Sequence, residues 1–515
     1  MLEQLEKEKK NFDFVVIGGG ATGIGIALEA SARGYSVALF EMSDFAKSTS
    51  CKSTKLVHGG VRYLAQGDVA LVREACVERG RLLANAPHLV KNQSFIIPAF
   101  GFYDEFLYTV GLKFYDLMAG RYSLGRSKRI TKKETLRRMP GVSEKGLTGG
   151  ILYHDGQFDD SRMAISVLQT AVEKGAVVLN YFPVISLKKD GNGKLRGVSV
   201  KDLLTDKDYE VDGKVIINAT GVFADDIMQM DSPGMKREIK PSQGIHLILD
   251  PSFLGGNDAL MIPKTDDGRV LFAVPWHGKV VVGTTDTPVD AASLEPVALE
   301  EEIEFILSTA GRYLKKTPGR KDVLSVFAGL RPLAAPEGDG KKTKEISRSH
   351  KIIVSPTGLL TMIGGKWTTF RRMAEDMINK AEKIKGWKPV ASQTRKLKIH
   401  GYTTNVDLAD PLYVYGTDRE AILSLVAEQH ELGESISRES GMIKARIVWA
   451  VREEMAVNVE DVLSRRTRCQ LLNAKESVTI APEVARIMAE EMGKDEAWIK
   501  EQVTLYELVT RNYYF

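Results

Sequence analysis

The sequence predicts an α/β fold in three parts, and three observations lead to it. A β-branched apolar run at residues 12–17 precedes three glycines, a helix of small residues and a second apolar run, which is a βαβ unit. Residues 242–289 alternate as an antiparallel sheet does, and from about residue 400 onward the patterns are helical. We therefore expect a βαβ-based domain, an interleaved β-rich region and an all-helical C-terminal domain.

The composition is that of a globular protein. Of 515 residues, 43% are hydrophobic and 27% charged, which excludes a disordered or fibrous chain. The net charge of +4 predicts no nucleic-acid partner but fits anionic substrates or an anionic membrane surface. Three cysteines without a CxxC motif predict neither disulfides nor a metal site. The first ten residues do not resemble a signal peptide, and no apolar run nears the roughly 18–20 residues of a membrane span.

The other elements follow in order along the chain. Helices are predicted over residues 21–33, 68–86, 112–118, 163–174 and 369–385, and strands over 36–40, 94–100, 177–180, 214–218, 352–354 and 359–363. Thr131 with Glu134 indicates a helix N-terminus, and Asn192-Gly193 indicates a hairpin. After a linker at 387–401, helices are expected over residues 418–429, 442–454, 459–465, 482–492 and 495–509.

Glycines after the first strand predict a bound dinucleotide. Gly18, Gly20 and Gly23 form GxGxxG, which permits a tight turn, close approach of a pyrophosphate, and close packing of helix on strand. The N–H groups at the helix start favour the phosphates. Glu41, at the end of the second strand, can accept hydrogen bonds from the ribose hydroxyls, which disfavours NADP.

Two later glycine motifs favour FAD over NAD. Ala219-Thr220-Gly221 precedes the β-rich region and Gly364-Gly365-Lys366 follows it. Three separated motifs imply one long cofactor contacted by distant parts of the chain. The first part is therefore expected to be a Rossmann-like FAD-binding domain.

Six motifs occur in a fixed order along the chain. They are TS-x-x-S-x-KLVHGG-x-RYL (Thr49 to Leu64), NATG (Asn218 to Gly221), GTTDTP (Gly283 to Pro288), FAGLRPL (Phe327 to Leu333), GGKWTTFR (Gly364 to Arg371) and EDVLSRRTR (Glu460 to Arg468). In these the chain resembles the respiratory, FAD-dependent glycerol-3-phosphate dehydrogenases. Cys51 and Lys52 depart from the resemblance, since small residues are commoner there.

The resemblance implies a domain plan and a reaction. The plan is an FAD-binding domain at 11–85, 155–235 and 340–388, a substrate-binding region at 86–154 and 236–339, and a C-terminal helical domain at 395–515. The reaction is oxidation of sn-glycerol 3-phosphate to dihydroxyacetone phosphate, with the hydride passing to flavin N5 and the electrons to a quinone. A quinone acceptor suggests a cytoplasmic protein, peripheral to the inner face of the cell membrane. A homodimer is compatible with it.

Two histidines compete for the role of base in this reaction. His58 has a suitable intrinsic pKa, and two glycines beside it leave room for flavin or substrate. His58 could instead only pack against the isoalloxazine ring. His246 is the rival, although on an alternating strand it could be a core histidine.

A phosphate ester needs fixed cationic donors, and arginine suits it. Arg331 is the first candidate. The resemblance places Arg331, Arg62, Tyr63 and Lys366 around substrate and flavin. Lys366 could also stabilise charge developing on the flavin. Thr285 and Asp286 are expected at the edge of the substrate pocket.

The remaining candidates are expected at the cofactor. The full set is Gly18, Gly20, Ala21, Thr22, Gly23, Glu41, Thr49, Ser50, Ser53, Lys55, Leu56, His58, Val184, Ala219, Thr220, Gly221, Gly365, Lys366 and Thr368. The basic cluster Arg465, Arg466 and Arg468 is interpreted as a solvated helix face.

Three other functions stay open at this point. An oxidase would pass electrons to O2, but the chain lacks the insertion expected of the related glycerophosphate oxidases. In a dehydrogenase of another hydroxy acid or of an amine, the same cationic residues would bind a carboxylate instead of a phosphate, since both anions accept a bidentate arginine. A flavin-binding sensor without turnover is disfavoured because His58, Arg331 and Lys366 occur together.

Overall fold

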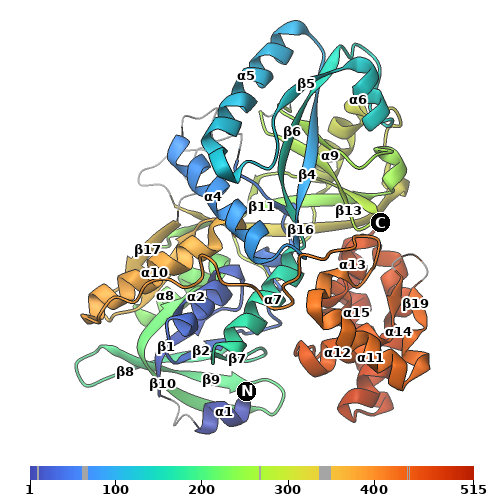
Figure 1. Ribbon diagram of the computed structural model, residues 1–515. Helices are drawn as coiled ribbons and strands as arrows, with labels where there is room; N and C mark the ends of the chain where they lie inside the picture. The colour runs from blue at the N-terminus through green and yellow to red at the C-terminus, as the bar shows by residue number, and fades with distance from the viewer. Residues whose placement is uncertain (8–10, 61–67, 266–267, 336–349, 438, 440) are drawn as a thin grey trace.

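The computed structural model describes residues 1–7, 11–60, 68–265, 268–335, 350–437, 439 and 441–515, and it consists of two large sheets and a C-terminal helical part (Figure 1). The first sheet has the order β17-β18-β10-β1-β2-β7, with β8 and β9 joined to β10. Its strands are β1 (Asn11–Ile17), β2 (Val37–Phe40), β7 (Val177–Leu179), β8 (Val184–Lys189), β9 (Leu195–Asp202), β10 (Lys207–Asn218), β17 (His350–Val354) and β18 (Leu360–Gly364).

The centre of this sheet is parallel, as the predicted βαβ unit requires. Strand β1 pairs in parallel with both β2 and β10, and β10 pairs in parallel with β18. Helix α2 (Ala21–Ala32) packs between α7 (Asp160–Glu173) and α10 (Phe370–Lys385), and the three helices share one hydrophobic core with a face of this sheet. The carboxyl ends of β1, β2 and β10 therefore meet at one edge, which is where a doubly wound sheet binds its ligand.

The second sheet has ten strands and is mostly antiparallel, as the alternating pattern predicts. It contains β3 (Leu56–Val57), β4 (Val90–Ala99), β5 (Lys128–Thr131), β6 (Gly149–Phe158), β11 (Ile239–Leu249), β12 (Ala259–Ile262), β13 (Leu271–Trp276), β14 (Lys279–Gly283), β15 (Thr287–Pro288) and β16 (Val323–Ala334). Helices α4 (Val69–Asn85), α5 (Phe102–Ala119), α6 (Lys132–Arg138) and α9 (Glu300–Tyr313) accompany it. The predicted boundary between residues 154 and 155 falls inside β6, and β3 extends this part back to residue 56.

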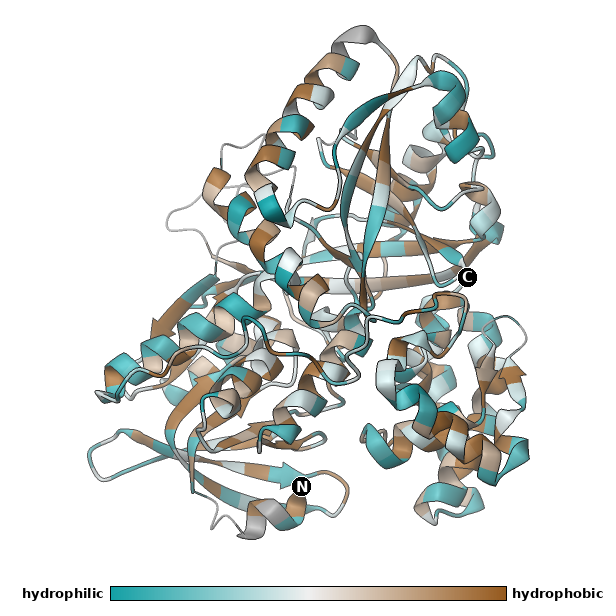
Figure 2. Cartoon of the chain, in the orientation of Figure 1, coloured by the Kyte–Doolittle hydropathy of each residue, from teal (hydrophilic) through white to brown (hydrophobic). Residues whose placement is uncertain are grey.

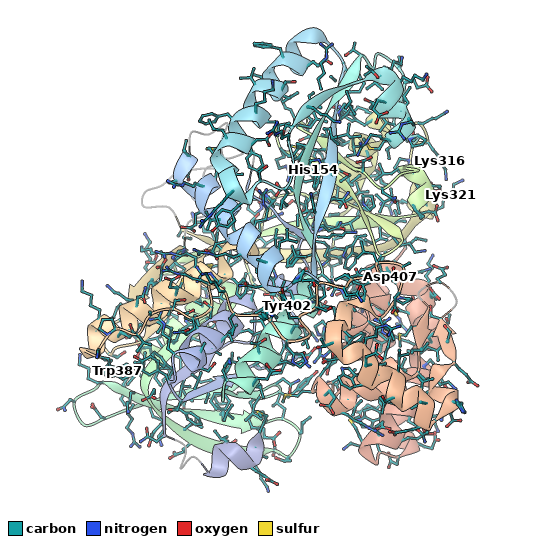
Figure 3. The ribbon with its side chains drawn as sticks, in the orientation of Figure 1. His154, Lys316, Lys321, Trp387, Tyr402 and Asp407 are labelled. Carbon is teal, nitrogen blue, oxygen red and sulfur yellow. The ribbon has the colours of Figure 1, made fainter. Side chains whose placement is uncertain are left out.

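The segment after α10 connects the first sheet to the C-terminal part. Figure 3 shows it running from Trp387 past Tyr402 and Asp407, across the middle of the molecule. Trp387 stacks on Tyr35 with ring centroids 5.3 Å apart, which anchors the start of this linker to the first sheet. The last helices are α11 (Arg419–Glu428), α12 (Ala445–Glu453), α13 (Cys469–Leu472), α14 (Ala474–Met492) and α15 (Glu496–Thr510).

The C-terminal part differs from the expectation in two details. A two-stranded ribbon, β19 (Ser435–Ser437) with β20 (Met442–Ile443), interrupts the helices. Residues Asp461–Arg466 form a π-helix within the EDVLSRRTR motif. Within the described residues, no helix combines the length and apolarity needed to cross a bilayer.

Candidate active site

Glycines shape the turn between β1 and α2. Gly18 has φ +107°, and a Cβ there would lie 2.8 Å from the carbonyl oxygen of Ala219. A Cβ on Gly23 would lie 1.9 Å from the carbonyl oxygen of Gly18, so only glycine lets α2 pack this close. The Ala21 N–H donates to Ser50 Oγ at 2.9 Å, which ties the helix start to the following loop.

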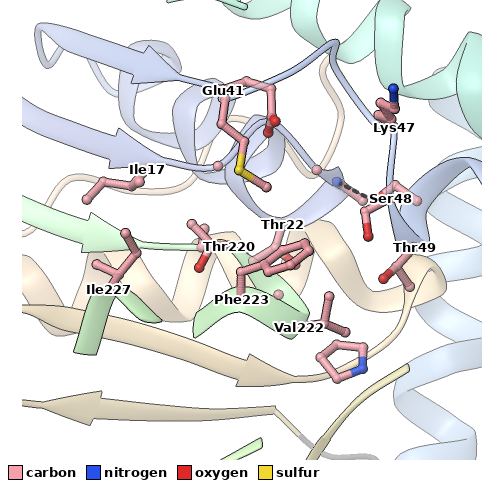
Figure 4. A pocket seen from close by; sticks show the side chains of 18 of the residues that line it. Ile17, Thr22, Glu41, Lys47, Ser48, Thr49, Thr220, Val222, Phe223 and Ile227 are labelled. Atoms are coloured by element: carbon pink, nitrogen blue, oxygen red, sulfur yellow. Dashed lines mark hydrogen bonds between the residues drawn. The ribbon is translucent and has the colours of Figure 1, made fainter. Parts of the chain in front are cut away.

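A cavity of about 350 Å³ opens at this turn, and we call it the nucleotide cavity (Figure 4). Its predicted lining residues are Gly18, Gly20, Ala21, Thr22, Glu41, Thr49, Ser50, Val184, Ala219, Thr220, Gly221, Gly365 and Lys366. They come from residues 18–50, 184, 219–221 and 365–366, far apart in the chain. The structure thus brings together all three glycine motifs around one space.

Glu41 lies at the end of β2 in the wall of this cavity. Its carboxylate accepts hydrogen bonds from the N–H groups of Gly19 at 2.6 Å and Ser43 at 2.9 Å. Burial raises the pKa of Glu41 above its ordinary value, and the two N–H donors oppose that rise. The side chain is held in place where a ribose would meet it.

A second space of about 200 Å³, the middle cavity, adjoins the nucleotide cavity. The two share Thr49, Pro332, Gly364, Gly365, Lys366 and Trp367 in their walls. The middle cavity also collects Ser53, Leu56, His58, His246, Arg331 and Thr368. Gly364 and Gly365 turn here with φ of +72° and +88°, values that side chains disfavour. Three of the six sequence motifs, together with His246 of β11, meet at this point.

A third space of about 150 Å³, the inner cavity, adjoins the middle one. They share Thr54, Leu56, His58 and Arg331. The inner cavity is lined further by Thr285 and Asp286, as predicted, and by Asp155 and Arg269. It has room for a small polar molecule next to the middle cavity.

Arg331 stands on β16 in the walls of both the middle and inner cavities. One terminal nitrogen donates to the Gln243 carbonyl at 3.2 Å and lies 3.4 Å from Asp286 Oδ1. The other donates to Thr284 Oγ1 at 3.1 Å and to the Thr285 carbonyl at 3.0 Å. The planar guanidinium is therefore fixed in orientation.

His246 faces the same space from β11. Its Nε2 lies 2.9 Å from Thr54 Oγ1, and its ring stacks on Phe327 with centroids 4.9 Å apart. Burial, and then the charges of Lys55 and Arg331, hold the pKa of His246 well below its ordinary value. The imidazole is consequently neutral at physiological pH.

His58 follows β3 and borders both the middle and inner cavities. Its carbonyl accepts a long hydrogen bond from Thr368 Oγ1 at 3.5 Å. The next residue, Gly59, donates its N–H to the Tyr115 hydroxyl at 3.0 Å, and that hydroxyl donates to Asp155 at 2.9 Å. A buried hydrogen-bond network from α5 and β6 thus fixes the backbone directly after His58.

Three predicted residues are placed differently from expectation or lie outside the description. Lys55 lines none of the three cavities; its ammonium is buried against Asp160 Oδ2 at 2.7 Å, and burial lowers its pKa to about 8. Its ammonium therefore joins the loop at Cys51 to Asp160 at the start of α7. Arg62 and Tyr63 lie outside the described residues.

Sequence reasoning missed Thr54, Asp155 and Arg269. Thr54 lies inside the first long motif, where its hydroxyl could have been noticed beside Ser53. Asp155 and Arg269 belong to no motif, and only the fold brings them to the inner cavity. Arg269 stacks on the Phe305 ring with its guanidinium 4.9 Å from the ring centroid.

The basic cluster of the C-terminal part is not a solvated helix face, so that interpretation was wrong. Arg465, Arg466 and Arg468 are each no more than 2% exposed. Arg466 donates to both oxygens of Asp44, at 2.7 and 2.9 Å, and Arg468 donates to Asp160 Oδ1 at 2.7 Å. Carboxylates of the first part of the chain neutralise these arginines, which is why they can be buried.

Comparison with known proteins identifies the family. A family model described as "FAD dependent oxidoreductase" matches residues 13–371, and one described as "C-terminal domain of alpha-glycerophosphate oxidase" matches residues 355–499. A probable mitochondrial glycerol-3-phosphate dehydrogenase of Dictyostelium discoideum is 37% identical, with the match covering 95% of this chain and 82% of that protein. The chain belongs to the FAD-dependent glycerol-3-phosphate dehydrogenase family.

Further similarities agree with this family. The mitochondrial glycerol-3-phosphate dehydrogenase of Homo sapiens is 37% identical, over 96% of this chain and 72% of that protein. A crystal structure of the Bacillus halodurans glycerol-3-phosphate dehydrogenase complexed with FAD superposes with a TM-score of 0.80 at 29% identity, covering 99% of this chain and 96% of that one. The predicted family, fold class, enzyme class and FAD cofactor are confirmed.

Proposed function

We propose that this chain oxidises sn-glycerol 3-phosphate to dihydroxyacetone phosphate and passes the electrons to a quinone. The observation that carries the proposal is the arrangement of Arg331, His58 and His246 where the middle and inner cavities adjoin. An anion bound by the arginine in the inner cavity would lie beside His58, with His246 in the wall of the adjoining middle cavity. The names of the relatives supply the identity of that anion.

The nucleotide cavity and the adjoining middle cavity fit FAD. A Cβ at Gly18 or Gly23 would clash with the backbone of Ala219 or Gly18, so these glycines set the tight turn, and the nucleotide cavity opens at that turn, where a dinucleotide binds in this fold. Thr49, Gly365 and Lys366 lie where this cavity meets the middle one. When bound, FAD supplies the hydride acceptor for the substrate and the route of electrons to the quinone.

The chain's own residues bind and orient the substrate. The guanidinium of Arg331 is held by the Gln243 and Thr285 carbonyls, and its charge suits a phosphate dianion. Arg269 brings a second guanidinium to the same cavity. Arg62 and Tyr63 remain candidates from the sequence. Lys366 would place a positive charge next to the flavin ring, with its ammonium nitrogen shielded from solvent.

His58 is proposed to take the proton of the substrate's secondary hydroxyl. It borders both cavities, so it can face substrate and cofactor together. His246 is proposed to orient the Thr54 hydroxyl, to which its Nε2 is bonded. His246 remains the rival base because its lowered pKa also keeps it neutral.

The substrate is tested by anaerobic stopped-flow absorbance of the oxidised flavin band. We expect rapid bleaching with glycerol 3-phosphate and none with glycerol, because only the ester offers the dianion to Arg331. Lactate and glycine test the alternative of a hydroxy-acid or amine dehydrogenase. Bleaching by one of them, and not by the phosphate ester, would overturn the substrate assignment.

The acceptor is tested with the enzyme reduced in that experiment. The proposal expects fast reoxidation by a soluble quinone analogue and slow reoxidation by O2. The similarity of residues 355–499 to an alpha-glycerophosphate oxidase domain makes O2 the second candidate. Fast reoxidation by O2 with release of peroxide would favour that oxidase. Because quinones dissolve in the bilayer, we also propose that the protein is cytoplasmic and peripheral to the inner face of the cell membrane.

A further inference from the structure

Three buried polar side chains from three different elements meet next to the backbone that follows His58. Arg79 of α4, Tyr115 of α5 and Asp155 of β6 are each no more than 2% exposed. Arg79 donates to the Tyr115 hydroxyl at 2.8 Å and to Asp155 Oδ1 at 2.7 Å, and the Tyr115 hydroxyl donates to Asp155 Oδ2 at 2.9 Å. We call these three residues the Tyr115 network.

The Tyr115 network ends at the backbone of Gly59. The Gly59 N–H donates to the Tyr115 hydroxyl at 3.0 Å and to Asp155 Oδ1 at 3.3 Å. The hydroxyl thus accepts from Gly59 and from Arg79 while it donates to Asp155, which uses all of its hydrogen-bonding capacity. The network therefore fixes the position of the Gly59 N–H.

The contact at Gly59 leaves no room for movement toward the network. A Cβ there would lie 2.3 Å from Tyr115 Oη and 2.5 Å from Cys76 Sγ. Burial, and then the charge of Asp155, raise the pKa of Tyr115 well above its ordinary value, so the hydroxyl keeps its proton and its bond to Asp155. The backbone beside His58 is consequently held in the same way across the physiological pH range.

Stability alone does not account for the Tyr115 network. The apolar side chains of Val72, Cys76 and Ala119 already join α4 to α5 around the Tyr115 ring. Figure 1 shows both helices beside the second sheet, and Figure 2 shows hydrophobic segments along both. The Arg79 ion pair carries a desolvation cost that apolar residues of similar size would avoid, and within the described residues Arg79 Nε is buried without a hydrogen-bond partner. These polar groups are therefore expected to serve the site that they adjoin.

We propose that Tyr115 is a positioning residue for the reaction, because its hydroxyl holds Gly59 and thereby places His58, which borders the middle and inner cavities. Neither Tyr115 nor Arg79 occurs among the described residues that line the three cavities, so Tyr115 acts on the substrate only through the residues that it holds. The inference deepens the proposed function and rests on it. A displaced proton acceptor slows the reaction and leaves binding of the phosphate ester to Arg331 intact.

Tyr115→Phe tests the hydroxyl and keeps the ring. Anaerobic stopped-flow absorbance at rising concentrations of glycerol 3-phosphate gives the limiting rate of flavin reduction and the apparent Kd. We expect the limiting rate to fall about tenfold or more, with the apparent Kd and the flavin content within about twofold of the unmodified protein's. A limiting rate at the unmodified value would overturn the proposal, whether or not the melting temperature falls.

Tyr506→Phe is the matched control for the loss of a buried hydroxyl. Tyr506 is 1% exposed, as Tyr115 is, and its hydroxyl donates to Ser477 Oγ at 2.7 Å in the C-terminal part. Its melting temperature should fall as that of Tyr115→Phe does, while its limiting rate stays unchanged. An equal fall in rate in both variants would mean that any loss of stability slows the reaction, which would contradict a positioning role.

A double variant tests whether Tyr115 acts through His58. In His58→Asn the proton acceptor is already absent, so Tyr115→Phe should slow flavin reduction no further in that background. Losses that multiply in His58→Asn/Tyr115→Phe would refute the proposed route. Gly59→Ala is a second single variant, whose Cβ would press on the Tyr115 hydroxyl, and it should also slow reduction about tenfold. An unmodified rate in Gly59→Ala would count against the proposal in the same way.

The unmodified protein separates this inference from the proposed function. Bleaching of its flavin by glycerol 3-phosphate, with an equal rate in Tyr115→Phe, refutes the positioning role and leaves the reaction standing. No bleaching of the unmodified protein by the phosphate ester refutes the reaction itself and, with it, the role of Tyr115 in that reaction.

Discussion

Arg331 is oriented by the hydrogen bonds of both its terminal nitrogens, and that geometry predicts what a lysine would do there. Arg331→Lys keeps the charge but cannot donate to Thr284 and to the Gln243 and Thr285 carbonyls together. We expect KM for glycerol 3-phosphate to rise about 10- to 100-fold, the loss of one charged hydrogen bond. Steady-state kinetics with a soluble acceptor measures it.

The same variant carries its own control. Arg331 does not line the nucleotide cavity, so the flavin content of Arg331→Lys should equal that of the unmodified protein. Arg137→Lys, on the exposed surface, should leave KM as it is. An unchanged KM in Arg331→Lys would indicate that another residue binds the phosphate, namely Arg269, Arg62 or Tyr63.

The two histidines are distinguished by the pH dependence of flavin reduction. A catalytic base must be deprotonated to act, so the rate of flavin reduction falls as the pH drops below the pKa of that base. His58→Asn should slow reduction about 10²- to 10⁴-fold and abolish this fall in rate at low pH. His246→Asn should keep this fall in rate, because burial holds the pKa of His246 well below its ordinary value. Stopped-flow rates between pH 5 and 9 would assign the base to His246 if the two variants behaved in the opposite way.

At the scale of the element, local patterns were sufficient for much of the fold. The turn after β1, the Thr131 cap of α6 with its 3.2 Å bond from the Glu134 N–H, and the β8–β9 hairpin each depend on neighbouring residues. Their sequences therefore predicted them. The π-helix at Asp461–Arg466 depends on partners more than four hundred residues away, such as Asp44. No local pattern contains that information.

The linker after α10 contains a pH-dependent ion-pair cluster of His400, Asp418 and Glu173, which we call the His400 staple. His400 bonds Asp418 Oδ2 at 2.6 Å and also pairs with Glu173, so it joins the linker to α7 and to the start of α11. Burial would lower its pKa, but the two carboxylates outweigh burial and raise it to about 9. The folded pKa lies above the unfolded value of about 6.5.

The sign of the effect on stability follows from that pKa. The staple's contribution to the free energy of unfolding is complete below about pH 6.5 and is lost as the pH rises through about 9. Its size is on the order of 2–3 kcal/mol. Urea unfolding at pH 6 and pH 9.5 should show this loss in the unmodified protein and not in His400→Gln. An equal loss in both would assign it to other groups.

At the scale of the whole molecule, the candidate site combines what a sequence can and cannot reveal. Gly18, Glu41, His58, Arg331 and Lys366 belong to motifs, so their chemistry was predictable. The order of the three cavities and the turning of Lys55 toward Asp160 depend on how two sheets meet. The burial of Arg466 likewise requires a carboxylate from the opposite end of the chain, which spacing alone cannot show.

That long-range contact predicts that the C-terminal part controls FAD affinity. Asp44 lies three residues after Glu41 and accepts two hydrogen bonds from Arg466. Burial alone would raise the pKa of Asp44, but the charges of Arg466 and Arg465 outweigh burial and hold it well below its usual value. Lys47, in the wall of the nucleotide cavity, bonds Glu460 at 2.7 Å. Two ion-pair contacts therefore join the C-terminal part to the loop that lines the nucleotide cavity.

Asp44→Asn removes the carboxylate that accepts two hydrogen bonds from the buried Arg466, and one of the three carboxylates that pair with Arg465. It should therefore cost about 3–5 kcal/mol of stability and weaken FAD binding. Because that variant could fail to fold, Glu460→Gln tests the second, less buried contact; it weakens the pair with Lys47 and one of the three pairs of Arg465, which keeps Asp44 and Asp461. It should raise the Kd for FAD several-fold in a fluorescence titration while the melting temperature of the FAD-free protein changes little. Glu483→Gln, whose partner Arg486 is exposed, is the matched control. An unchanged Kd in Glu460→Gln would mean that the C-terminal part stabilises the fold without acting on the cofactor loop.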